Sequence, residues 1–138
     1  MRVLALDYGS ARCGCALSDP TGTIATPLRA VARPATKRGF ARLRELVREQ
    51  QVERVVVGLP LSLDGGETEQ TRETRAFARA LAQRLGERVP VEMHDERFTT
   101  RIAQRIGAEG RAGARARTSE DSRAAAHLLQ SWLAAHPS

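Results

Sequence analysis

Three acidic residues stand where folding could bring their carboxyl groups together. Asp7 lies in LALDYGSARCG and Glu96 in VEMHDERFTT, each at the end of a short apolar run that is typical of a buried strand. Asp121 lies in TSEDSRAAAHLLQ, where the pattern predicts that a helix begins. Hard divalent cations such as Mg²⁺ or Mn²⁺ prefer oxygen ligands, so carboxylates on a rigid sheet would suit one. Phosphodiester hydrolysis is the chemistry that such a metal site most often serves.

Two of these carboxylates also have a structural alternative. Asp7 stands just before Tyr8-Gly9, and a strand-end aspartate in that setting often bonds nearby backbone amides in a turn. Thr118 and Asp121 are three residues apart and resemble a capping box, so Asp121 could instead cap the last helix.

Asp95 competes with Glu96 for the second position, because adjacent residues on a strand point to opposite faces of the sheet. Alternation places Glu96 on the more polar face of its strand. We therefore expect Glu96 to face Asp7, while Asp95 caps the helix that follows or pairs with Arg97.

The apolar pattern predicts an α/β domain built from elements that could position these residues. Strands are expected at residues 3–7, 13–18, 23–32, 54–58 and 89–94, and helices at 37–51, 69–85, 97–106 and 119–135. A tight turn at Gly9 would join the first two strands. Strands alternate with helices in the second half of the chain, which favours crossover connections and a partly parallel sheet.

Composition limits the size and the partners of this domain. With 138 residues and 41% hydrophobic content, the chain suits one domain, 1–138, with one core. No apolar run approaches the ~20 residues that span a bilayer, so we expect a cytoplasmic protein without a membrane partner. The net charge of +6 and the pI of about 10.8 fit a polyanionic partner such as nucleic acid. Cys13 and Cys15 are expected to be core thiols, and the histidines lack metal-binding spacing.

Two polar segments could hold the phosphates of such a partner. In GLPLSLDGGET, Gly58 and Gly65 would let the backbone approach a phosphate, with Asp64 positioning the loop, although the segment could also be a plain surface loop. Residues 107–117, GAEGRAGARAR, predict a mobile basic loop. The arginines expected to contact the phosphate backbone are Arg12, Arg97, Arg115 and Arg117.

Four motifs in this order, LALDYGSARCGCALSD, VVVGLPLSLDGGETEQT, DERFTT and EDSRAAAHLLQSWL, resemble the YqgF family. Its members are RuvX-like and similar to Holliday-junction resolvases, and they are regarded as nucleases that mature the 5′ end of pre-16S rRNA. The resemblance implies an RNase H-like α/β fold, with a five-stranded mixed sheet and helices on both faces. It also implies that Asp7, Glu96 and Asp121 are the catalytic residues and bind Mg²⁺ or Mn²⁺, and that Gly9 and Arg12 lie at the substrate.

Other functions remain open at this point. The substrate could be branched DNA rather than pre-rRNA, or the domain could be a non-catalytic RNA-binding factor in ribosome assembly. The Asp-x-Gly hairpin also resembles the phosphate-binding signature of sugar kinases and actin-like ATPases, but those enzymes need two such lobes and this chain has room for one. The protein could act as a monomer or a homodimer.

Overall fold

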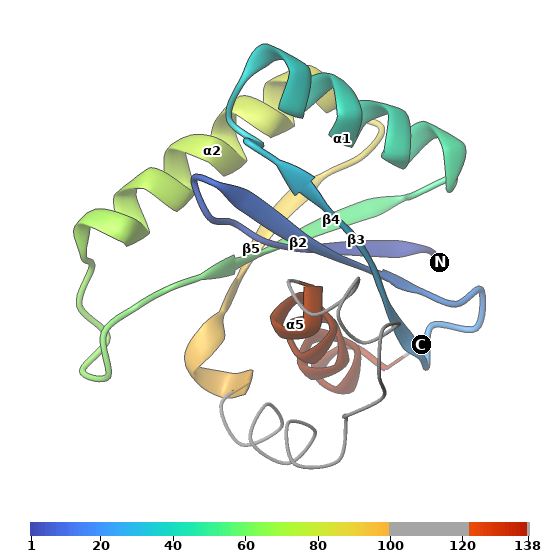
Figure 1. Ribbon diagram of the computed structural model, residues 1–138. Coiled ribbons are helices and arrows are strands. Elements are labelled where there is room, and N and C mark those ends of the chain that lie inside the picture. The colour runs from blue at the N-terminus through green and yellow to red at the C-terminus, as the bar shows by residue number, and fades with distance from the viewer. Residues whose placement is uncertain (100–121, 138) are drawn as a thin grey trace, which may run out of the picture.

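The computed structural model describes residues 1–99 and 122–137, which form one sheet with helices packed against both of its faces (Figure 1). The elements in chain order are β1 (Val3–Asp7), β2 (Arg12–Ser18), β3 (Ala25–Ala32), α1 (Lys37–Glu49), β4 (Arg54–Leu59), α2 (Glu69–Leu85), β5 (Val91–Asp95), η1 (Glu96–Thr99) and α5 (Arg123–Ala135). Every predicted strand is present, so the α/β class is confirmed.

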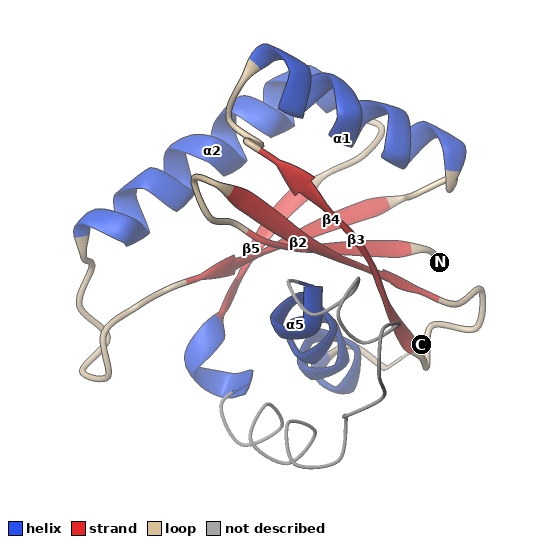
Figure 2. Cartoon of the chain, in the orientation of Figure 1, coloured by secondary structure: helices blue, strands red, loops and turns tan. Residues whose placement is uncertain are grey.

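The five strands form a mixed sheet in the order β3-β2-β1-β4-β5 (Figure 2). β1 pairs antiparallel with β2, and β2 pairs antiparallel with β3. On its other side β1 pairs parallel with β4, which in turn pairs parallel with β5. Because these three strands run the same way, their carboxyl ends meet at one edge of the sheet, where open α/β sheets usually bind ligands.

Alternation along the strands gives the sheet two separate apolar faces. Leu4 and Leu6 of β1 belong to the cluster that α1 and α2 cover, whereas Val3 and Ala5 belong to the cluster that α5 covers. Figure 1 shows α1 and α2 on one side of the sheet and α5 on the other. Asp7 continues the alternation of Val3 and Ala5 and therefore belongs to the α5 side.

The helices begin at caps that the sequence encodes. The Thr36 side chain accepts a hydrogen bond from the Gly39 amide at the start of α1. Thr68 and Thr71 form a reciprocal capping box at the start of α2. Each helix then buries one apolar stripe, centred on Phe40 in α1 and on Phe77 in α2.

Element ends differ from the predictions by one or two residues. β3 begins at Ala25, whereas the sequence predicted a strand from residue 23. β5 spans Val91–Asp95, whereas the sequence predicted 89–94. α1 ends at Glu49, because Gln51 adopts a positive φ of 53° that no helix continues through. The predicted helix 97–106 is described only over its first residues, as the 3₁₀ helix η1. The predicted loop 107–117 and the predicted helix start at 119–121 lie outside the described residues.

Both cysteines are buried free thiols, as predicted. Within residues 1–99 and 122–137, no helix is both long and apolar enough to cross a membrane.

Candidate active site

The carboxyl groups of Asp7 and Glu96 meet at the carboxyl ends of the parallel strands. Asp7 is the last residue of β1, and Glu96 follows β5 as the first residue of η1. β1 and β5 lie on either side of β4. The side chains of Asp7 and Glu96 reach across the end of β4 and form a hydrogen bond with each other. The structure thus brings together two of the three carboxylates singled out in the sequence.

Burial and mutual repulsion favour a state in which one of these two carboxyl groups is protonated. Burial raises the pKa of Asp7, and the hydrogen bond from Glu96 opposes that shift in part. Burial, followed by the hydrogen bond to Asp7 and the negative charge of Asp7, raises the pKa of Glu96 to about 8. Glu96 is therefore the protonated partner and donates to the Asp7 carboxylate. Two carboxyl groups this close ionise together only when positive charge offsets their repulsion.

Gly58 of β4 makes room for the Glu96 side chain. It lies one residue beyond the Leu6–Val57 pair and is itself paired with His94. A Cβ atom added at Gly58 would lie 2.5 Å from Oε1 and 2.9 Å from Cγ of Glu96, closer than unbonded atoms approach. The prediction that Gly58 lets the backbone approach a phosphate stays a prediction. The space above Gly58 is occupied by the carboxylate.

Replacing Gly58 by alanine is expected to displace Glu96 from Asp7 without unfolding the domain. The clashing atoms belong to the end of a flexible side chain, so the side chain rotates away and the backbone keeps its place. For the phosphodiester cleavage that the sequence analysis expects of this pair, a misplacement of about 1 Å can cost about 100-fold in rate, so the rate should fall by about that factor. Circular dichroism and thermal melting beside a single-turnover cleavage assay would measure both effects.

Gly86→Ala is the matched control for this variant. Gly86 ends α2 with φ +77°, and no atom lies within 4 Å of an added Cβ. That variant should lose stability because of backbone strain and keep its cleavage rate, the opposite pattern from Gly58→Ala. Full activity in Gly58→Ala would show that the position of Glu96 is not critical.

Asp95 points away from this pair and binds Arg97. Its Oδ1 accepts hydrogen bonds from the Arg97 amide at 2.9 Å and from Nε at 3.1 Å, and its Oδ2 accepts from Nη2 at 2.6 Å. The hydrogen bond from the Arg97 side chain is the main cause that lowers the pKa of Asp95. Asp95 thus stays ionised and orients Arg97, and it is Glu96 that faces Asp7.

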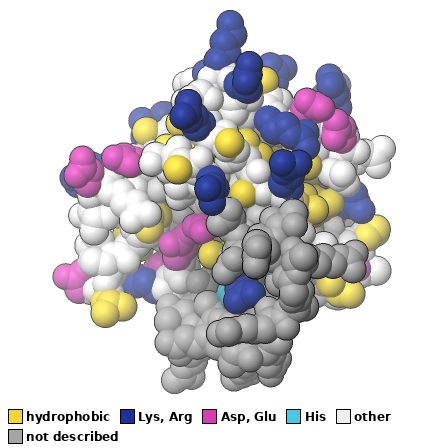
Figure 3. Space-filling view, viewed as in Figure 1, with side chains coloured by type: hydrophobic (Ala, Val, Ile, Leu, Met, Phe, Trp, Pro, Cys, Tyr) yellow, Lys and Arg dark blue, Asp and Glu magenta, His cyan; other side chains and the backbone are white. Residues whose placement is uncertain are grey.

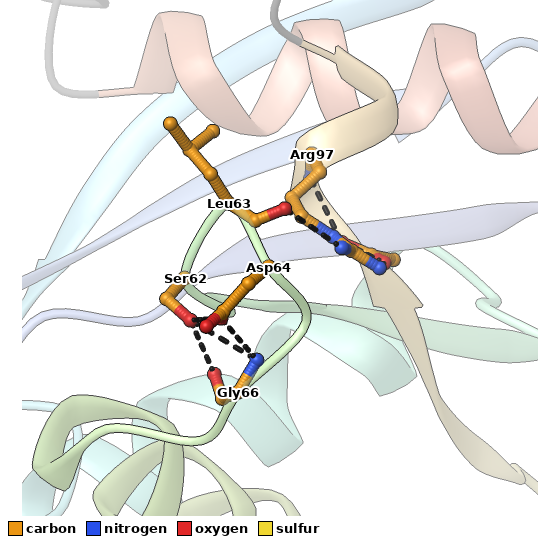
Figure 4. A network of polar contacts seen from close by, with 6 residues as sticks. Ser62, Leu63, Asp64, Gly66 and Arg97 are labelled. Carbon is orange, nitrogen blue, oxygen red and sulfur yellow. Dashed lines mark hydrogen bonds and ion pairs between the residues drawn. The ribbon is translucent and has the colours of Figure 1, made fainter.

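Arg97 also touches the loop that follows β4 (Figure 4). Its Nη1 donates to the carbonyl of Leu63 at 3.3 Å. Gly65 has φ +90°, and a Cβ added there would lie 3.3 Å from the same nitrogen. A side chain at position 65 would therefore be strained by its backbone and would also press on Arg97.

The loop itself is ordered by Asp64 and Ser62. The Asp64 carboxylate accepts from the Gly66 amide at 2.9 Å and from the Ser62 hydroxyl, and these bonds lower the pKa of Asp64. The Ser62 amide donates to the Gly66 carbonyl at 3.0 Å. Asp64 thus shapes this loop, as the sequence analysis predicted for its side chain, and the contact of the loop with phosphate stays a prediction.

The turn between β1 and β2 is tight at Gly9, where an added Cβ would lie 2.8 Å from the Arg12 carbonyl oxygen. Arg12 follows this turn with an exposed side chain at the same edge as Asp7. Gly9 and Arg12 therefore lie at the same edge of the sheet as the carboxylate pair, and their contact with substrate stays a prediction.

The described part of α5 begins close to the same edge. Ser122, its N-cap, is buried, and its hydroxyl accepts a hydrogen bond from the Cys15 amide at 3.0 Å. Cys15 neighbours Gly14, which pairs with Asp7. The predicted site residues Asp121, Arg115 and Arg117 lie outside the described residues. Among residues 1–99 and 122–137, no group of three or more His, Cys, Asp or Glu side chains could hold a metal ion.

Sequence reasoning missed several contacts that shape this site. The packing of Glu96 on Gly58, the bond from Arg97 to the Leu63 carbonyl and the Ser122–Cys15 bond join segments that are far apart in the chain. A glycine that interrupts the β-branched run RVVVG was the available signal for the first of these. The other two carry no sequence signal.

A family model described as "RuvX: Holliday junction resolvase" matches residues 1–135. A relative from Mycobacteroides abscessus is 45% identical over 136 residues, covering 96% of this chain and 80% of its own length. One from Anaeromyxobacter is 42% identical and covers 96% of each chain. Both carry the name "Putative pre-16S rRNA nuclease".

Solved structures of two resolvases share the fold. RuvC of T. thermophilus, in complex with a Holliday junction substrate, aligns over 98% of this chain and 94% of its own, with a TM-score of 0.66 and 16% identity. The Fowlpox virus resolvase, in complex with Holliday junction DNA, aligns over the whole of both chains with a TM-score of 0.60 and 11% identity. These likenesses support the RNase H-like architecture that the motifs predicted.

Proposed function

The chain belongs to the family described as RuvX, Holliday junction resolvase, and on that premise we propose that it is a metal-dependent endonuclease acting on structured nucleic acid. Its proposed substrate is the precursor of 16S rRNA, whose 5′ end it would process. The names of relatives up to 45% identical support that choice. The observation that carries the proposal is the half-buried Asp7–Glu96 pair at the carboxyl edge of the sheet.

The donor set at this edge fits a divalent cation. Two half-buried carboxyl groups that share a proton supply hard oxygen ligands and too much negative charge for both to ionise unaided. Asp7 and Glu96 would hold Mg²⁺ or Mn²⁺. We propose Asp121 as the third ligand, because it directly precedes Ser122, which is bonded to the strand beside Asp7. A bound divalent ion supplies an acidified water and stabilises the charge on the leaving oxygen.

The residues of the chain prepare this chemistry by position and charge. Asp7 and Glu96 are fixed at the ends of two strands of one rigid sheet, and Gly58 holds open the space that Glu96 needs. Arg97 is oriented by Asp95, so its guanidinium can contact a phosphate near the pair while its other bonds hold the loop after β4. Arg12 would contact the phosphate backbone of the substrate on the other side of the Asp7–Glu96 pair.

Branched DNA is the second candidate substrate, because the family description names Holliday junction resolvases. We further propose that the protein acts in the cytoplasm, where rRNA is processed in bacteria. We also propose that residues 1–138 form a single domain.

A cleavage comparison on two substrates tests the proposal. The protein should cut a precursor fragment that spans the 5′ end of 16S rRNA at a defined position, in the presence of Mg²⁺, faster than it cuts a four-way DNA junction. The measurement is single-turnover cleavage with product mapping at equal concentration of each substrate. Faster cleavage of the junction would make branched DNA the substrate of this site.

A further inference from the structure

Exposed basic side chains gather at the corner where β3 ends and α1 begins. Arg12, Arg33, Lys37 and Arg38 are all exposed, and together we call them the basic corner. In the space-filling view, Lys and Arg side chains cluster over the α1 side of this face (Figure 3). The sequence analysis assigned a role only to Arg12, so the other three residues have no function so far.

The basic corner lies at the same edge of the sheet as Asp7. β3 runs in the same direction as β1, because both pair antiparallel with β2. Arg12 pairs with Ala32, the last residue of β3, and the Arg33 amide donates to the Ala11 carbonyl at 2.9 Å. The Thr36 amide then donates to the Arg33 carbonyl at 3.2 Å, which fixes the first turn of α1 against this corner.

The distance from Asp7 sets how far along a nucleic acid the basic corner could reach. Two strand spacings of about 4.8 Å separate β1 from β3. One helical turn of about 5.4 Å then leads into α1. The basic corner therefore lies on the order of 15 Å from Asp7, a span of a few base pairs of a double helix.

Some arginines of the fold are held in ion pairs, whereas Arg33, Lys37 and Arg38 are not, a property they share with the control residues Arg44, Arg48 and Arg88 within the described part of the chain. Arg42 lies 3.7 Å from Glu45 and 4.0 Å from Glu49, and Arg75 lies 3.0 Å from Glu67. Within the two described stretches of the chain, none of the side chains of Arg33, Lys37 and Arg38 forms an ion pair.

These charges are also unfavourable for the helix that carries them. The first turn of α1 contains no acidic residue, and Lys37 and Arg38 stand next to the positive end of the helix dipole. Basic residues in that position cost a helix about 0.3–1 kcal/mol each. The positions of Lys37 and Arg38 are therefore not explained by the stability of α1, and their charges complement an anionic partner.

The aromatic side chains decide between a single strand and a double helix. Single-strand binders stack bases on exposed aromatic rings. The rings of Tyr8, Phe40, Phe77 and Trp132 are not exposed: Phe40 is buried, the centroids of Tyr8 and Phe77 stack 4.4 Å apart, and those of Trp132 and His136 stack 4.2 Å apart. The side chain of Phe98 lies outside this comparison. A surface of cations without rings suits a partner that presents only its phosphates, which is the double helix.

We infer that the basic corner binds the phosphate backbone of a double-helical RNA segment that adjoins the scissile bond, a few base pairs from Asp7. This inference rests on the proposed function for its choice of RNA. It adds that the enzyme requires a stem on one side of the cleavage position, held across β2, β3 and the first turn of α1.

The test compares two triple variants with the same change in net charge. The first carries Arg33→Asn, Lys37→Gln and Arg38→Gln, with asparagine at position 33 because Arg33 has φ +43° and asparagine tolerates a positive φ. The control carries Arg44→Gln, Arg48→Gln and Arg88→Gln, which are also exposed and lie further along α1 or before β5. Binding of a blunt RNA duplex, of one isolated strand and of the matching DNA duplex is titrated at several salt concentrations, without divalent metal.

The first variant should bind the RNA duplex at least about tenfold more weakly, with the slope of log K against log salt reduced by about two to three units. The control variant should change that slope by less than about one unit. Equal losses in the two variants, or wild-type binding of the isolated strand as tight as that of the duplex, would overturn the inference. Tighter binding of the DNA duplex than of the RNA duplex would overturn the choice of RNA. The titration measures binding and involves no cleavage. It would therefore still test the inference about the basic corner if the nuclease proposal failed.

Discussion

Replacing Asp7 by asparagine is expected to lower metal-dependent cleavage by more than about 100-fold. Loss of a residue that only supports a metal ligand already costs about 10- to 100-fold in metal affinity or activity. Asparagine keeps the shape of the side chain at the end of β1 but removes the anionic oxygen that faces Glu96. Binding of nucleic acid should stay equal or become slightly tighter, because one negative charge near the phosphates is gone.

Asp19→Asn is the matched control for that experiment. Asp19 follows β2 at the opposite edge of the sheet, and its Oδ1 accepts hydrogen bonds from the Thr23 and Ile24 amides at 2.8 Å, which an asparagine oxygen can also accept, while the bonds from Thr21 to Oδ2 are lost. It removes the same charge without touching the site, so its cleavage rate should match the wild type. Single-turnover assays on both variants measure the cleavage rate, and salt titrations measure the affinity for nucleic acid. Undiminished cleavage by Asp7→Asn would refute the nuclease mechanism and favour a non-catalytic RNA-binding role.

Replacing Glu96 by glutamine is expected to stabilise the metal-free protein at alkaline pH while it abolishes cleavage. The pKa of Glu96 is about 8 in the folded protein, against 4.5 for an unperturbed glutamate. Between those values the unfolded chain releases a proton that the folded chain retains, so stability falls as pH rises and is lowest above pH 8. Glutamine does not titrate, and its amide can donate to Asp7 as the protonated glutamate does.

The size of this effect follows from the shift in pKa. One pKa unit corresponds to about 1.4 kcal/mol. Partial exposure of Glu96 screens the interaction, so we expect a difference of about 1–3 kcal/mol between pH 5 and pH 9. For a domain of this size that difference moves the melting temperature by roughly 2–15 °C. Thermal melts of wild type and Glu96→Gln across this range measure it, with both proteins stripped of metal.

Added Mg²⁺ provides an independent measurement on the same two proteins. At pH 9 it should raise the melting temperature of the wild type more than that of Glu96→Gln, because binding to the folded state alone stabilises it. Parallel pH profiles of the two proteins, together with an equal response to Mg²⁺, would contradict the view that Glu96 carries unfavourable charge that a cation relieves.

The fold could be predicted from sequence because its signals are local. Apolar alternation located β1 and β4, and helical spacing around Phe40 and Phe77 located α1 and α2. The choice of Glu96 over Asp95 rested on strand alternation and on the family resemblance. Glu96 does contact Asp7, but from the first residue of η1, because β5 ends at Asp95. Boundaries were less accurate, because turn geometry such as the positive φ of Gln51 depends on tertiary packing.

The interactions that shape the site could not be predicted in the same way. The Gly58–Glu96 contact depends on the register between β1, β4 and β5, which no single segment encodes. The bond between Arg97 and the Leu63 carbonyl depends on how the loop after β4 folds back. Arg33, Lys37 and Arg38 come together with Arg12 only because β3 runs parallel to β1.

The two faces of β1 have a practical consequence for protein engineering. Leu4 and Leu6 pack under α1 and α2, while Val3, Ala5 and the carboxylate of Asp7 belong to the α5 side. Repacking the cluster around Leu43 and Leu81 should therefore change thermal tolerance with little effect on turnover. A single residue inserted within β1 would turn the later side chains of that strand to the opposite face, so the core contacts of Leu6 and the placement of the Asp7 carboxylate beside Glu96 would be lost together.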